Sequence, residues 1–338
     1  MRPQKLIERL NSWVGGLLRL EEDIEEENKA LAGEINHRRQ HLAELRDNFK
    51  FFFSGGENYV RWIELEDQTK IIKTTPLHCN RLLGEILNEK CRSATLTSAT
   101  LTIGDDFDFI KNKTGVGDDS CSLALETPFD YRSQAEFVLL EDGPFPGKTR
   151  NFYDYLESSI RAICRHHSGR SLILFNSFRT LNELKRRCRG EFGFPLLVHG
   201  EDEGRSKLLE KMVRIPDSVL FGTGTFWEGV DVPGENLQAV VITRLPFPVP
   251  DDPLVEARSA ELKEEGKNPF RELMLPEAVL KFRQGLGRLI RTATDRGKIY
   301  CLDSRCYSRS YGKNFLSGLP EGIPVKTINK ETLINSGF

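Results

Sequence analysis

The sequence contains no apolar stretch that could cross a bilayer, no secretory signal and no cysteine pattern typical of metal ligands. In 338 residues no apolar run approaches about 18 residues, and the N-terminus lacks an apolar signal core. The 7 cysteines include no C-x-x-C pair, which argues against a four-cysteine iron–sulfur site. Cys164 and Cys301 lie in apolar segments, as unpaired thiols do in reducing compartments. We therefore expect a cytoplasmic protein with no membrane partner.

A complete phosphate-binding loop is also missing. Such a loop reads G-x-x-x-x-G-K-[ST], and its backbone N–H groups surround the phosphates. Residues 143–150, GPFPGKTR, come closest, but Asp142 stands at the first glycine position. Two of the three residues between Gly143 and Gly147 are prolines, which have no N–H to offer. We interpret this segment as a surface loop; a kinase that uses Lys148 is the alternative, and Lys148→Ala would separate the two.

The charge of the chain is nearly balanced but unevenly distributed. The formal net charge of -2 argues against a uniformly basic nucleic-acid coat. Residues 161–189, however, carry eight Lys or Arg against one acid, and residues 279–313 carry nine against two. These two segments are candidates for contact with an anionic partner.

The first part of the chain is predicted to be helical and then to form a hairpin. Between Leu6 and Phe49 apolar residues recur at steps of three and four, which is typical of long antiparallel or coiled helices. Residues 59–64 and 69–75 then resemble two strands of a hairpin. Residues 76–90 are predicted to be a helix, and the small and β-branched run 93–101 a buried strand.

From Glu136 onward strands alternate with amphipathic helices. This alternation predicts a parallel sheet covered on both faces, with ligands at the carboxyl ends of the strands. The predicted strands are 136–141, 171–175, 195–200, 218–223, 238–244 and 298–303, and the predicted helices are 152–167, 177–188, 204–214 and 276–291.

The segment QGLGRLIR, residues 284–291, is the most informative candidate site. On a helix Gln284, Arg288 and Arg291 are spaced i, i+4 and i+7 and share one face. Two glycines remove side-chain bulk beside these residues, although each costs about 1 kcal/mol in a helix interior. The pattern favours binding of an anion over a merely solvated basic face.

Two further loops carry polar residues at predicted strand ends. Residues 224–237 are rich in glycine and include Glu228 and Asp231, which suit either a structural turn or a functional loop. Asn176 and Ser177 end another strand and begin a basic helix, and a helix N-terminus is a natural phosphate site. The ring of Phe178 suits stacking on a base. The alternative is that Phe178 is a core residue and Ser177 only caps the helix.

Four blocks together resemble motifs III to VI of superfamily 2 helicases, in order and spacing. Together with residues 245–258, LPFPVPDDPLVEAR, they resemble the DinG/XPD branch, and bacterial DinG in particular, over residues 59 to about 320. The four blocks are TSATLT (97–102), LILFNSFRTL (172–181), GTGTFWEGVDVPGENL (222–237) and QGLGRLIRTATDRG (284–297).

The resemblance implies roles for individual residues. Arg288 and Arg291 would be arginine fingers for the γ-phosphate of ATP. Gln284, Gly229 and Asp231 would border the nucleotide, with Glu228 coupled to them. Residues implied for other roles are Ser98 and Thr100, which would couple hydrolysis to DNA grip, and Asn176, Ser177, Phe178 and Thr225, which would line the path of single-stranded DNA.

The resemblance also implies parts that this sequence lacks. A complete member has a phosphate loop and a D-E-A-H box, which hold ATP and Mg²⁺ upstream of a helical arch. We therefore expect an α/β chain with RecA-like architecture: an arch remnant at 1–50, the end of motor domain 1 at 51–105 and motor domain 2 at 106–338. It would be the C-terminal fragment of a 5′ to 3′ ATP-dependent DNA helicase of DNA repair, nearly inactive without its N-terminal half.

A different class of function stays open. The chain would then be a stand-alone nucleic-acid-binding or adaptor protein with a coiled-coil arm, which self-associates through residues 1–50. The two converging arginines argue against it, because a pure binding module has no use for them.

Overall fold

The computed structural model describes residues 3–335 except 25–27, 57, 67–68, 104–105, 118, 148, 191, 202, 229–231 and 233. The chain forms two compact units. The first comprises residues 1–79 and 250–261, and the second comprises residues 80–249 and 262–338. The boundaries that we expect at residues 50 and 105 stay predictions.

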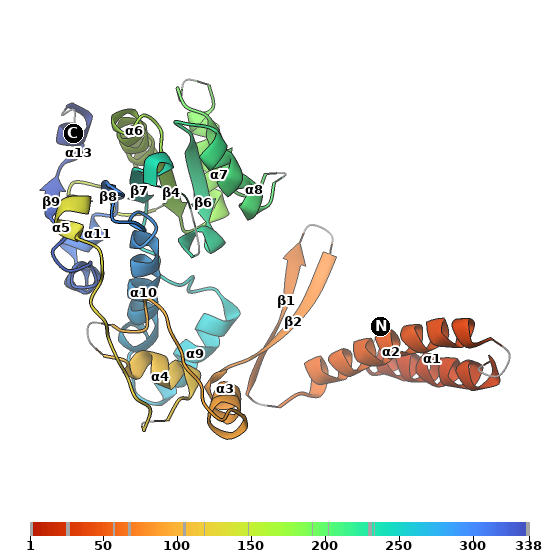
Figure 1. Cartoon of the computed structure of the whole chain (residues 1–338). Helices are drawn as coiled ribbons and strands as arrows, with labels where there is room; N and C mark the ends of the chain where they lie inside the picture. Colours follow the sequence, from red (N-terminus) through yellow and green to blue (C-terminus); the bar gives the residue numbers. More distant parts are fainter. Residues whose placement is uncertain are drawn as a thin grey trace. The chain divides into compact units, whose positions relative to one another are not determined.

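The first unit is built on a helical hairpin and a β-hairpin (Figure 1). α1 (Pro3–Ile24) and α2 (Lys29–Ser54) lie side by side, and Arg39 Nε contacts Glu21 Oε2 at 2.8 Å. β1 (Tyr59–Glu66) and β2 (Thr69–Pro76) pair antiparallel. The structure thus has the two helices and the hairpin that the periodicity indicates. In the described part of the chain, no helix is long and apolar enough to span a bilayer.

The second unit contains a seven-stranded parallel sheet of order β5-β6-β4-β7-β8-β3-β9 (Figure 1). Because every pairing is parallel, the carboxyl ends of all strands meet at one edge. The strands are β3 (Ala135–Leu140), β4 (Ser171–Phe175), β5 (Leu196–Val198), β6 (Val219–Thr223), β7 (Ala239–Ile242), β8 (Gly297–Cys301) and β9 (Val325–Ile328).

Helices cover both faces of this sheet, as expected for a RecA-like domain. Side chains of β3 alternate between two apolar clusters: Phe137 and Leu139 face one, and Val138 and Leu140 face the other. The first cluster includes residues of α8 (Arg205–Arg214), α10 (Leu275–Leu286) and α12 (Gly312–Leu316). The second includes residues of α6 (Arg150–His166), α7 (Phe178–Cys188) and α13 (Lys330–Asn335). The remaining helices are α3 (Asn80–Gly84), α4 (Asp108–Thr114), α5 (Tyr131–Gln134), α9 (Pro253–Glu264) and α11 (Arg305–Ser308), with π-helical turns at Glu85–Lys90 and Phe270–Met274 and 3-10 turns at Gly224–Trp227 and Gly234–Asn236.

Two predicted elements differ from the structure. The buried strand predicted at 93–101 is wrong: these residues form no strand, and nearly all are exposed. Small β-branched residues become a strand only where a neighbouring strand supplies hydrogen-bond partners, and no described strand pairs with this segment. The helix predicted at 276–291 ends instead at Leu286.

Candidate nucleotide and DNA site

The segment after β6 is anchored by a buried tryptophan. Trp227 is fully buried, and its Nε1–H donates to the carbonyl oxygen of Phe175 at 2.9 Å. A Cβ atom added at Gly285 of α10 would lie 3.1 Å from atoms of the Trp227 ring. Glycine therefore allows α10 to approach the tryptophan closely, which joins the two candidate segments of the sequence into one site.

α10 ends before the two candidate finger arginines. Gly287 caps the helix with φ -65° and ψ 6°, and its N–H donates to the carbonyl of Arg283 at 3.1 Å. Arg288 Nε donates to the carbonyl of Gln284 at 2.8 Å, a contact typical of a basic side chain at a helix C-terminus. The shared helix face predicted for Gln284, Arg288 and Arg291 is therefore wrong, because Gly287 ends the helix.

The structure nevertheless brings the two arginines into one electrostatic cluster. Burial lowers the pKa of the half-buried Arg288 guanidinium, and the charges of Arg291 and Arg205 lower it further. Glu228 acts in the opposite direction and raises the pKa of Arg288. Since arginine stays protonated in proteins, the cluster holds three positive charges, with the carboxylate of Glu228 beside Arg288. Such partly desolvated positive charge is suited to a polyanion such as a triphosphate.

Arg205 is the member of this cluster that the sequence did not reveal. It is the first residue of α8, and its Nη2 donates to the carbonyl of Glu228 at 2.9 Å. A cation in the first turn opposes the helix dipole. This local cost is the one sequence signal that would have marked Arg205 as a candidate.

Arg291 is presented by a turn that Asp295 holds together. The buried Asp295 accepts hydrogen bonds from the backbone N–H of Arg291 at 2.7 Å and of Thr292 at 2.9 Å. Burial acts to raise the pKa of Asp295, but these bonds and one from the Thr292 hydroxyl outweigh it, so the pKa is lowered. Gln134 braces the same turn, since its Nε2 donates to the carbonyl of Thr292 at 2.8 Å.

The predicted coupling residues lie beside α10. Gln284 Nε2 is 3.5 Å from Thr100 Oγ1, which is a weak hydrogen bond, and Arg283 donates to the carbonyl of Thr102. Ser98 contacts Thr100, with 3.3 Å between the two hydroxyl oxygens. The structure thus brings Thr100 against Gln284, and Ser98 contacts Thr100.

The predicted DNA-contacting residues lie at the carboxyl ends of the neighbouring strands β4 and β6. Asn176 Nδ2 donates to the carbonyl of Leu245 at 2.7 Å. Ser177 Oγ accepts from the N–H of Thr180 at 3.3 Å and is the N-cap of α7. Phe178 is 47% exposed and so is not a core residue. Thr225, in the turn after β6, is exposed.

Comparison with known proteins identifies the family. Residues 160–322 match the helicase C-terminal domain family. ATP-dependent DNA helicase YoaA of Escherichia coli (strain K12) is 37% identical over 273 residues, or 80% of this chain and 42% of the relative. The 3′-5′ exonuclease DinG of Bacillus subtilis (strain 168) is 34% identical over 286 residues, or 80% of this chain and 30% of the relative. The chain contains a helicase C-terminal domain of the DinG-like family.

The DinG-like chain spans less than half of the length of these curated relatives. A solved XPD helicase aligns with a TM-score of 0.60 at 16% identity, covering 89% of this chain and 55% of that chain. An apo XPD structure gives 0.59, also at 16% identity, and covers 91% of this chain and 60% of that one. At such identity the likeness shows the fold alone, which agrees with the expected RecA-like architecture.

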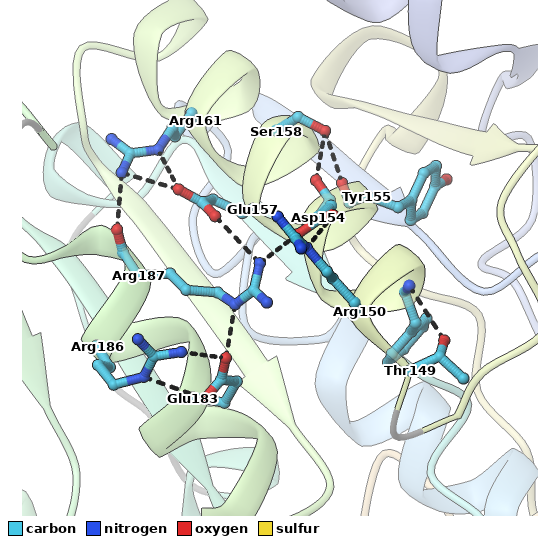
Figure 2. Close-up of polar contacts among 11 residues, drawn as sticks. Thr149, Arg150, Asp154, Tyr155, Glu157, Ser158, Arg161, Glu183, Arg186 and Arg187 are labelled. Carbon is cyan, nitrogen blue, oxygen red and sulfur yellow. Dashed lines mark hydrogen bonds and ion pairs between the residues drawn. The ribbon is translucent and has the colours of Figure 1, made fainter.

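Most of the Lys and Arg side chains between residues 161 and 189 of the DinG-like chain form ion pairs with Asp or Glu of the same chain (Figure 2). Arg187 contacts Glu183 at 2.7 Å and Asp154 at 2.5 Å, and Arg161 contacts Glu157 at 3.1 Å. Such pairs leave less net charge for a nucleic acid than the sequence count indicates.

Other predicted residues have structural roles or lie outside the described part. Thr149 Oγ1 accepts from the N–H of Phe152 at 3.3 Å and caps α6, as expected of a surface loop before a helix (Figure 2). Lys148, Gly229 and Asp231 lie outside the described residues. The described residues contain no group of three or more His, Cys, Asp or Glu that could hold a metal ion.

Proposed function

We propose that this chain supplies the second motor domain of an ATP-dependent DNA helicase, with Arg288 and Arg291 as arginine fingers. The observation that carries the proposal is the electrostatic cluster of Arg288, Arg291 and Arg205, in which Arg205 is held by its hydrogen bond to the carbonyl of Glu228. A catalytic finger neutralises charge that develops on the transferred phosphoryl group, and contributes about 10³ to 10⁵ in rate.

The finger role requires that another motor domain holds ATP. That domain would carry the phosphate loop and the D-E-A-H box, and Mg²⁺ bound there would offset the charge of the phosphates. One finding supports this division: the chain spans less than half of the length of a relative that is named as an ATP-dependent DNA helicase. Gln284, Gly229, Asp231 and Glu228 would border the nucleotide from this side.

The DNA would cross the carboxyl edge of the sheet at Asn176, Ser177, Phe178 and Thr225. Ser98 and Thr100 would couple this edge to the nucleotide, because Thr100 contacts Gln284 of α10. Movement from 5′ to 3′ and a role in DNA repair belong to the same proposal and rest on the family resemblance. A cytoplasmic location also belongs to it and rests on the free, buried thiols of Cys164 and Cys301.

A stand-alone adaptor is the second candidate function. The α1–α2 hairpin exposes large apolar side chains, among them Trp13 at 56% and Leu20 at 49%. Such exposed apolar surface suits a protein partner or a second copy of the chain. On this alternative the hairpin would bind, and the arginine cluster would have no catalytic role.

Reconstitution tests the proposal. This chain is mixed with a separately prepared motor half that carries a phosphate loop, and ATP hydrolysis is measured with and without single-stranded DNA. We expect neither half alone to hydrolyse ATP appreciably, and the mixture to show hydrolysis that DNA stimulates. A mixture that forms a complex without gaining activity would favour the adaptor.

A further inference from the structure

The loop after β3 exposes an aromatic ring that the proposed motor role does not use. Phe145 is 62% exposed and stands between Pro144 and Pro146 in the segment GPFPGKTR. Each proline fixes its own φ, and the residue before a proline is confined to extended backbone. The ring is therefore displayed on a stiff loop.

Two arginines that follow β8 contact this ring. The guanidinium carbons of Arg305 and Arg309 each lie 5.6 Å from the centroid of Phe145. Arg305 also lies 5.5 Å from the centroid of Phe247, and Phe247 packs against the buried Phe315. The exposed ring is thus connected through Arg305 to the rigid core.

The fully buried Asp303 fixes Arg305 in place. Arg305 Nη2 contacts Asp303 Oδ2 at 2.6 Å, and Asp303 Oδ2 also accepts from the N–H of Leu245 at 2.8 Å. Arg309 forms no ion pair within the described residues, so its charge stays available to a ligand. Arg244, exposed after β7, adds a third cation; partial burial and the charge of Arg305 lower its pKa.

We propose that Phe145, Arg305 and Arg309 form a stacking platform for a base of single-stranded nucleic acid. The platform extends the proposed DNA path and in that respect rests on the proposed function. A flat ring accepts any base, and the guanidinium groups beside it attract the phosphates. Arg305 is a positioning residue, because its own charge is already paired with Asp303.

The position of the loop agrees with a continuous strand of nucleic acid. Phe145 follows β3, whereas Asn176 and Phe178 follow β4, and both strands end at the same edge of the sheet. β7 and β8 separate these two strands, so three inter-strand steps of about 4.8 Å put the ends of β3 and β4 about 14 Å apart. At the rise of ~3.4 Å per nucleotide that a strand has in duplex DNA, this span corresponds to at most about four stacked nucleotides.

Binding of an oligonucleotide to this chain tests the platform. Fluorescently labelled oligothymidylate is titrated at two salt concentrations with the wild-type chain and with Phe145→Ala. Since base stacking on an aromatic ring contributes about 1–3 kcal/mol, we expect Phe145→Ala to weaken binding about 5- to 150-fold. Phe145→Trp should restore affinity, and its new indole should be quenched on binding. Arg309→Gln should weaken binding mainly at low salt and lower the salt dependence.

Matched controls separate the platform from general effects. Phe53→Ala removes an exposed ring of α2, and Arg214→Gln removes an exposed cation of α8; both should bind as the wild type does. If Phe145→Ala binds oligothymidylate as tightly as the wild type, the platform is excluded and the ring belongs to a protein contact. The assay uses this chain alone and needs no ATP hydrolysis. Failure of the platform would therefore appear in oligonucleotide binding, whereas failure of the motor role would appear in the reconstituted ATPase.

Discussion

At the scale of single residues, the site depends on side-chain contacts made after the end of α10. Arg288 and Arg291 follow α10 rather than lie on it, and Asp295 shapes the turn that presents Arg291. The sequence indicated the arginines because their spacing matches a helicase motif. It did not indicate Arg205, since that contact depends on how α8 is placed in three dimensions.

Substitution Asp295→Asn tests this turn. We expect it to lower the free energy of unfolding by about 1–3 kcal/mol at pH 7, because a charged acceptor of several hydrogen bonds is lost. The folded-state pKa of Asp295 lies below its usual value of about 3.9. Its contribution is therefore complete above that pH and disappears as the pH falls through the folded pKa.

Urea unfolding between pH 7 and pH 2.5 measures this difference. The gap between the wild type and Asp295→Asn should narrow below about pH 3.9. Asp217→Asn, which alters an exposed ion pair with Arg170, serves as the control and should change stability by less than about 1 kcal/mol. A gap that does not depend on pH would contradict the assigned role of Asp295.

At the scale of elements, most strands of the sheet could be predicted because each is a continuous run of apolar residues. All six strands predicted from Glu136 onward are present, because each is a largely buried apolar run in a sheet covered on both faces. β9 was not predicted, since it is an edge strand with three of its four residues exposed and so has no apolar signature. The end of α10 was also missed, because sequence alone does not tell which of two nearby glycines continues a helix.

The two glycines of this motif should respond differently to alanine. A Cβ atom at Gly285 would lie 3.1 Å from the fully buried Trp227 and 3.3 Å from Leu174. We expect Gly285→Ala to destabilise by about 1–2 kcal/mol, since overpacking exceeds the gain in helix propensity. Gly287 has no neighbour within 3.6 Å of that position and a negative φ, so Gly287→Ala should stay within about 0.5 kcal/mol. Equal effects in chemical denaturation would contradict the packing described for Gly285.

At the scale of the whole molecule, the two units differ greatly in the core that each buries. Among the described residues of α1 and α2 only Leu10 and Ala32 are buried, whereas the seven-stranded sheet lies between two large apolar clusters. We expect backbone amides of α1 and α2 to exchange at least about a hundredfold faster than those of β4 and β7.

Hydrogen exchange at two protein concentrations checks this expectation. Equal protection of the hairpin and the sheet would contradict it. Protection of α1 and α2 that rises with concentration would instead favour self-association through residues 1–50.

The central claim is that Arg288 acts on the nucleotide in the transition state. Its most direct test is the turnover number of the reconstituted ATPase with Arg288→Ala, compared with Arg214→Ala on the exposed side of α8. We predict that Arg288→Ala lowers kcat about 10³-fold or more, changes KM little, and leaves DNA binding intact, while Arg214→Ala behaves as the wild type. A kcat within tenfold of the wild type for Arg288→Ala would contradict the finger assignment.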